Sequence, residues 1–153
     1  MSIVIANEED FDIIKNITHT TIKHIYPRYY PVGAVKFFIN HHNDESILTD
    51  IKNGKCYIIT NENSVPVGTV TVKGNEILRL FVLPEYQKKG YGKNLLDFSE
   101  RIIAEKHDCI VISASLPAKN IYLKRGYKET EYHTILTENN DFLCYDEMIK
   151  YIK

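Results

Sequence analysis

The chain has 153 residues and a formal net charge of −1 at pH 7, with 44% hydrophobic and 25% charged residues. This balance is that of an ordinary globular protein, so we expect a single domain over residues 1–153 without extended disorder. The near-neutral charge favours neither nucleic acid nor a membrane surface as a partner. The N-terminus lacks a signal-peptide pattern and no segment approaches roughly 18 apolar residues, so we expect a cytoplasmic protein.

The first half of the chain predicts a short strand followed by three helices. Apolar residues recur at helical spacing after the strand at residues 3–6, and Pro27 ends this first helix. Pro31 can open a second helix. The third is expected over residues 45–52, closed by Asn53 and Gly54.

The second half of the chain alternates between strand and helix patterns. Strands are expected at residues 55–60, 65–72, 77–83, 110–112, 127–136 and 142–151. Helical spacing returns after residue 90 and again over residues 118–124. The pattern predicts an α/β (α+β) protein with a central mixed sheet.

The cysteine and histidine residues do not predict a metal site. Cys56, Cys109 and Cys144 form no CxxC pair or His/Cys cluster and are expected to be reduced thiols. His41 and His42 are neighbours on a predicted helix, where adjacent side chains diverge by about 100°. We therefore expect them not to face one site, and no third ligand is evident.

A glycine loop joins a buried strand to an amphipathic helix. Gly90 and Gly92 let backbone N–H groups approach an anion, because no Cβ stands in the way. These groups also begin a helix, where unpaired donors and the macrodipole favour phosphate. Three cations flank them, at Lys88, Lys89 and Lys93. The loop predicts a diphosphate site, although it matches neither GxxxxGK[ST] nor GxGxxG, and a plain turn with solvated lysines is the alternative.

A second motif follows after the next predicted strand. Residues 87–92 fit QxxGxG, and residues 118–127 fit AxxxYxKxGY. Together, and with this order of elements, they resemble the signature of the GNAT superfamily of acyl-CoA-dependent N-acyltransferases. The resemblance implies a mixed, mostly antiparallel sheet flanked by helices. It also implies acetyl-CoA as the acyl donor, a primary amine as the acceptor, and no metal.

The resemblance assigns residues to each part of acetyl-CoA. In this superfamily the strand before the loop separates from the next parallel strand, and its free edge pairs with the pantetheine arm. That edge corresponds here to Leu80, Phe81 and Val82. Ser115 stands where many members carry an Asn that contacts pantetheine. The pyrophosphate would be held by the loop, with Gln87 as its brace, through Lys88, Lys89, Gly90, Tyr91, Gly92 and Lys93.

The resemblance also implies catalytic roles. The N–H of Val82 would stabilise the oxyanion formed on the thioester carbonyl. Tyr122 matches the tyrosine that protonates the departing thiolate, although a tyrosine packed on the sheet is the alternative. Glu76 is the candidate base. Counting from the loop, however, gives Ile77, and the two face opposite sides unless a bulge intervenes, which the sequence does not lead us to expect. A water chain is the alternative base.

The acceptor and the partners stay open at this point. The aromatic loop of residues 26–31 can line an acceptor slot or cover the sheet edge. Arg79 can reach that slot or pair with a carboxylate on an adjacent strand. An exposed final strand would allow pairing across a homodimer. Besides an enzyme, the sequence is compatible with a CoA-binding sensor or interaction module, and with a scaffold that binds neither substrate.

Overall fold

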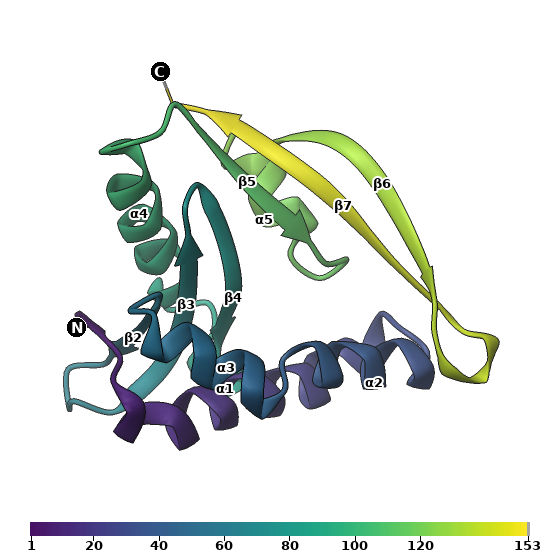
Figure 1. Ribbon diagram of the computed structural model, residues 1–153, viewed down its shortest axis with the longest axis horizontal. Coiled ribbons are helices and arrows are strands. Elements are labelled where there is room, and N and C mark those ends of the chain that lie inside the picture. Colours follow the sequence, from purple (N-terminus) through teal and green to yellow (C-terminus); the bar gives the residue numbers. More distant parts are fainter. Residues whose placement is uncertain (153) are drawn as a thin grey trace.

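The computed structural model of the protein describes residues 1–152. Seven strands form one sheet in the order β1-β2-β3-β4-β5-β7-β6, with β4 and β5 parallel and the other neighbours antiparallel (Figure 1). The strands are β1 (Ser2–Ile5), β2 (Cys56–Thr60), β3 (Pro66–Lys73), β4 (Glu76–Val82), β5 (Cys109–Ala114), β6 (Lys128–Leu136) and β7 (Phe142–Tyr151). The α-helices are α1 (Phe11–Ile25), α2 (Val32–His41), α3 (Asp44–Lys52), α4 (Tyr91–Ala104) and α5 (Lys119–Lys124). The predicted mixed, mostly antiparallel sheet flanked by helices is confirmed.

Helices cover both faces of the sheet, and each face has its own apolar core. On one face α4 packs through Leu95 and Ile103, which are at most 1% exposed. On the other face α1 and α3 bury Ile14 and Ile47 completely. Burying one such side chain contributes about 2 kcal/mol. The helical spacing of the apolar residues thus fixes which side of each helix meets the sheet.

The helix boundaries have local causes that are visible in the sequence. Asn7 and Asp10 form a capping box just before α1. The Asn43 side chain accepts a hydrogen bond of 2.8 Å from the backbone N–H of Ser46 and so caps α3. Pro27 follows the last residue of α1 by two positions. The predicted positions of these helices are therefore confirmed.

The final strand does not lie at the edge of the sheet. β7 lies between β5 and β6, and it pairs with β5 over the whole of Cys109–Ala114. The expectation of an exposed final strand was wrong, because the hairpin returns the chain to β5 and leaves β6 outermost.

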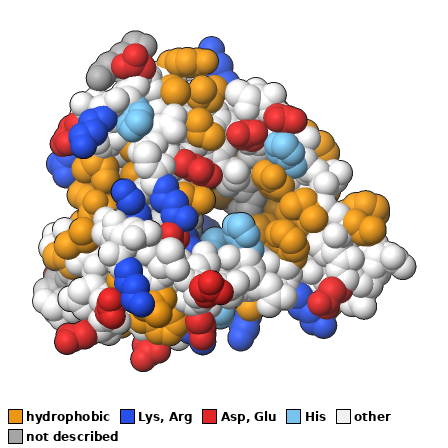
Figure 2. Space-filling view, in the orientation of Figure 1, with side chains coloured by type: hydrophobic (Ala, Val, Ile, Leu, Met, Phe, Trp, Pro, Cys, Tyr) orange, Lys and Arg blue, Asp and Glu red, His pale blue; other side chains and the backbone are white. Residues whose placement is uncertain are grey.

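In Figure 2, a hollow lies at the middle of the face shown, bordered by charged and histidine side chains.

The structure shows the state of the cysteines and the character of the helices. All three cysteines are free, Cys56 buried and the other two half-buried. Within residues 1–152, no helix combines the length and the apolar composition that a membrane span requires.

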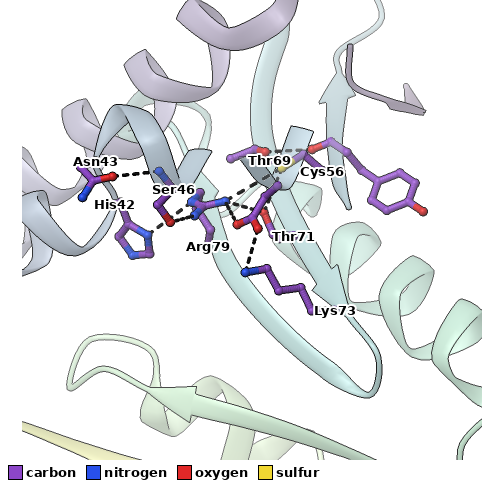
Figure 3. A network of polar contacts seen from close by, with 10 residues as sticks. His42, Asn43, Ser46, Cys56, Thr69, Thr71, Lys73 and Arg79 are labelled. Carbon is purple, nitrogen blue, oxygen red and sulfur yellow. Dashed lines mark hydrogen bonds and ion pairs between the residues drawn. The ribbon is translucent and has the colours of Figure 1, made fainter. Parts of the chain in front are cut away.

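A buried polar network joins α3 to β4 (Figure 3). The guanidinium of Arg79, with a side chain 4% exposed, lies 3.0 Å from the carboxylate of Asp50 on α3. It also donates to Thr71 Oγ1 at 3.0 Å and to Ser46 Oγ at 3.2 Å. Lys73 Nζ lies 2.7 Å from the other Asp50 oxygen. The carboxylate partner of Arg79 therefore comes from a helix, not from an adjacent strand.

His42 completes the network just after α2. Arg79 Nε donates to His42 Nδ1 at 3.3 Å, so this nitrogen carries no proton and the ring is neutral. The His41 and His42 rings contact each other, with centroids 5.0 Å apart. Their surroundings nevertheless differ, because His42 is buried against Arg79 whereas His41 is exposed and stacks on Phe37.

The neutral His42 ring makes the stability of the fold depend on pH. Burial, followed by the charge of Arg79 and the neighbouring His41 and His19, lowers the pKa of His42 to about 3. The unfolded ring takes up a proton near pH 6.5. Between these two values the unfolded state binds more protons than the native state, so the free energy of unfolding decreases as the pH falls.

We expect His42→Asn to reduce this pH dependence. Its amide oxygen can replace Nδ1 as the acceptor for Arg79, but it does not titrate. Below about pH 6 the variant should lose up to about 1 kcal/mol less stability per pH unit than the wild type. Urea denaturation between pH 7 and pH 4.5 measures this difference. His24→Asn, at an exposed position, is the matched control. Equal slopes for His42→Asn and the wild type would contradict the assignment.

Candidate functional site

The parallel strands β4 and β5 separate soon after they meet. Their pairing is limited to Glu76–Val111 and Ile77–Ile112, and the rest of β4 has no partner on that side. Leu83 donates its N–H to Val67 of β3 at 2.9 Å. Because successive N–H groups of a strand point to opposite edges, the Val82 N–H points away from β3, into the opening. The end of β4 therefore presents a free backbone edge.

A bulge in β4 lies directly before this free edge. Thr69 pairs with Phe81 and Thr71 pairs with Leu78, so two steps along β3 match three steps along β4. Arg79 lies inside the bulge with φ at +49°, a conformation that costs a non-glycine residue on the order of 1–3 kcal/mol. The sequence did not lead us to expect this bulge.

The bulge changes which β4 side chains share a face. Lys73 pairs with Glu76 and reaches Asp50 on α3, so Glu76 also faces the α1–α3 side. Arg79 faces that side too, whereas Ile77 packs in the core under α4. Counting back from the loop pointed to Ile77 for this position. The bulge inserts one residue between Ile77 and the loop, so the same count made along the observed strand leads to Glu76.

Burial and neighbouring charges act on the Glu76 carboxyl group. Burial raises its pKa, Glu147 of β7 raises it further, and Lys73 opposes both. A raised pKa brings a carboxylate closer to the range in which it accepts protons from substrates.

The loop after β4 leads into α4 without a side-chain cap. Gly90 is the N-cap residue, with φ at +92°, and within residues 1–152 no side chain makes a capping hydrogen bond to the first turn of the helix. Lys88 also has a positive φ, at +62°. Gln87 Nε2 donates to the Val82 carbonyl at 2.9 Å and ties the loop to the end of β4. Tyr91 packs its ring into the core, so only its backbone faces the loop. The N–H groups at the start of α4 are thus open to an anion.

The three lysines of the loop differ in their contacts. Lys93 Nζ lies 2.9 Å from Asp97 one turn along α4. Lys89 Nζ lies 5.6 Å from the centre of the Tyr86 ring. Lys88 is exposed. Lys93 is therefore already paired, and Lys88 and Lys89 are the cations nearest to the loop that have no carboxylate partner among residues 1–152.

Tyr122 lies buried beside the open ends of β4 and β5. It is 5% exposed and belongs to the same apolar cluster as Val82 and Ala114. Burial raises the pKa of Tyr122, and Tyr26 raises it further. Among residues 1–152, none makes a hydrogen bond to the Tyr122 hydroxyl. This phenol is therefore protonated at neutral pH and its O–H is free to donate.

Two tyrosines from the α1–α2 connection reach across to the end of β5. Tyr26 donates to Ser115 Oγ at 3.2 Å. The Tyr30 hydroxyl donates to the Cys144 carbonyl at 3.0 Å and accepts from the Leu116 N–H at 2.8 Å. Both rings are buried, so these tyrosines are part of the core as well as neighbours of the opening.

Acidic side chains gather on the β6–β7 hairpin, on the same side of the sheet as Glu76. Glu131 pairs with Glu147 across the two strands. His133 Nε2 lies 3.3 Å from Glu147 and 3.5 Å from Glu131, and its ring stacks on Tyr145 with centroids 4.8 Å apart. The face of the sheet that carries Glu76 therefore also carries the carboxylates of Glu131 and Glu147.

The structure brings most of the predicted site residues together. The free edge of β4, the loop and Tyr122 converge where β4 and β5 separate, and Ser115 lies at the adjacent end of β5. Sequence reasoning missed the bulge, although its signal was present. Arg79 is a charge between apolar neighbours in β4, and a charge at such a position indicates a buried partner.

Known proteins resemble the chain in sequence and in structure. The family model for the acetyltransferase (GNAT) domain matches residues 25–142. A curated Bacillus subtilis (strain 168) protein, named as an acetyltransferase, is 28% identical over 113 residues, which is 65% of this chain and 77% of the relative.

Solved structures share the fold over nearly the full length. A GCN5-related N-acetyltransferase from Rhodopseudomonas palustris has a TM-score of 0.87 at 25% identity, covering 98% of this chain and 94% of its own. An N-acetyltransferase from Thermoplasma acidophilum, in complex with coenzyme A, has a TM-score of 0.72 at 24% identity and covers 99% of both chains. An acetyltransferase from Salmonella typhimurium with acetyl-CoA has a TM-score of 0.73 at 17% identity, covering 100% of this chain and 94% of its own. With a family model matching most of its length, this chain belongs to the GNAT acetyltransferase family.

Proposed function

We propose that this protein transfers an acetyl group from acetyl-CoA to a primary amine, by direct attack of the amine on the thioester. One observation carries the proposal: the free edge of β4 ends in a loop that opens onto an uncapped helix N-terminus. The complexes of similar proteins with coenzyme A and with acetyl-CoA support acetyl-CoA as the donor. We take residues 1–153 as one acetyltransferase domain.

In this proposal, backbone groups make most of the contacts to the donor. The edge formed by Leu80, Phe81 and Val82 pairs with the amides of the pantetheine arm, as an added strand would. The N–H groups that begin α4 bind the pyrophosphate, and Lys88 and Lys89 add positive charge. Ser115 follows the end of β5, across the opening from the end of β4, and we assign its hydroxyl to contact pantetheine. The bond from Tyr26 holds that hydroxyl in place.

Charge development during the reaction matches the groups at the opening. As the amine nitrogen attacks the thioester carbonyl, negative charge on the oxygen is stabilised by the Val82 N–H. The C–S bond then breaks, and Tyr122 donates its O–H to the departing thiolate. The attacking nitrogen loses one proton as the sulfur gains one from Tyr122, and exchange with solvent then returns a proton to Tyr122 and removes one from the base. Glu76, with its raised pKa, is the group we assign to accept the proton from the amine.

The acidic lining supports an amine as the acceptor. An ammonium group is attracted to carboxylates, and Glu76, Glu131 and Glu147 lie on the acceptor side of the sheet. The free thiols of all three cysteines suit a reducing compartment, so we place the reaction in the cytoplasm.

The loop can be tested with two glycines of similar conformation. Gly90 and Gly74 both have positive φ, and a Cβ on either would meet no atom within 4 Å. Valine is strained by the positive φ at both positions, but only position 90 belongs to the proposed pyrophosphate site. We expect Gly90→Val to abolish the rise in melting temperature that acetyl-CoA produces in the wild type, and Gly74→Val to retain it. An undiminished rise in folded Gly90→Val would argue against the site.

The role of Tyr122 can be tested by removing its hydroxyl. With an amine accepted by the wild type, we expect Tyr122→Phe to lower kcat by about 100-fold, with little change in the KM for acetyl-CoA. Tyr57→Phe is the matched control, because that ring packs on Phe98 under α4. An unchanged kcat in Tyr122→Phe would remove the acid assignment. A wild type that binds acetyl-CoA but acetylates none of a broad amine and peptide panel would indicate a CoA-binding sensor.

A further inference from the structure

The bulge in β4 coincides with the separation of β4 and β5. Ile77 is the last β4 residue that pairs with β5, and Arg79 follows two positions later. Arg79 is also the residue with a φ of +49°, and it lies between the paired residues Leu78 and Phe81. A bulge bends its strand and increases the local twist. The backbone of Arg79 is thus the junction between the paired and the free parts of β4.

The side chain of Arg79 fixes this junction to the helical layer. Its guanidinium bonds to Asp50, Ser46 and Thr71, and its Nε bonds to His42 (Figure 3). These partners come from α3, from β3 and from the residue that follows α2. A buried guanidinium needs partners for its N–H groups, and this position supplies them. The Arg79 side chain therefore lies among these partners, and the left-handed backbone conformation of Arg79 points it toward them.

We propose that Arg79 is a positioning residue for the acyl donor: its bond to Asp50 holds the bulge, and the bulge holds the Leu80–Val82 edge that binds pantetheine. This inference rests on the proposed function and adds to it a residue that touches neither substrate. All of the side-chain bonds of Arg79 lead to the α3 side, away from the free edge. Its effect must therefore pass through the backbone of β4.

A paired substitution separates this role from general stability. Arg79→Met leaves the buried Asp50 carboxylate with Lys73 as its cationic partner, and Asp50→Leu leaves the buried Arg79 guanidinium without a carboxylate, so both should lower the melting temperature. The double variant replaces the pair by apolar side chains, an exchange that proteins often accept without loss of stability. We expect the double variant to regain most of the melting temperature and yet to bind acetyl-CoA about tenfold more weakly than the wild type.

The control is an ion pair on the other side of the sheet. Lys150 Nζ lies 2.8 Å from Glu100, remote from the bulge. Lys150→Met should leave the Kd for acetyl-CoA unchanged. Arg79→Lys keeps the charge but lacks the forked geometry of the guanidinium, so we expect a folded protein with binding between the wild type and the double variant. Isothermal titration calorimetry with acetyl-CoA measures all of these constants.

The outcomes distinguish the inference from the proposed function. Tight binding by the wild type together with equally tight binding by the double variant overturns the inference and leaves the proposed function intact. No binding by the wild type overturns both. If the double variant does not fold, Arg79→Lys decides: an unchanged Kd in that folded variant overturns the inference, and weaker binding supports it.

Discussion

The buried ion pair between Arg79 and Asp50 affects the interior charge, the packing of a helix and the backbone of a strand. It neutralises a guanidinium in the interior, it attaches α3 to the middle of the sheet, and it accompanies the one left-handed residue of β4. A charge buried with only part of its network would be costly, since removing one partner of such a pair typically costs about 3–5 kcal/mol. The favourable contacts of the side chain thus offset the unfavourable backbone, and the sheet opens at the position where the two meet.

The two sides of this opening differ in charge although the chain as a whole is almost neutral. The loop before α4 offers backbone donors and lysines, which suit the phosphates of a nucleotide. The opposite side offers carboxylates from β4 and from the β6–β7 hairpin, which suit an ammonium group. In the proposed reaction, opposite local fields of this kind would direct the donor and the acceptor to different sides.

Much of the fold could be predicted because its signals are local. Helical spacing, asparagine caps and prolines determine α1 to α3, and the glycine loop marks the start of α4. The errors concern features that depend on contacts between distant segments. A bulge changes the count along β4 by one residue, and only its register with β3 reveals it. The place of β7 inside the sheet depends on its pairing with β5.

The separation of β4 and β5 has a further effect on what can bind to the free edge. A strand that adds to an ordinary sheet edge can run past it at both ends, which is how exposed edges seed aggregation. Here the Ile77–Ile112 pair closes one end. A strand of another protein that paired with this edge could not extend past the Ile77–Ile112 pair. A molecule whose end lies next to that pair can be accommodated. The protein can thus keep unsatisfied backbone groups available in its sheet with little risk that another chain will recruit them.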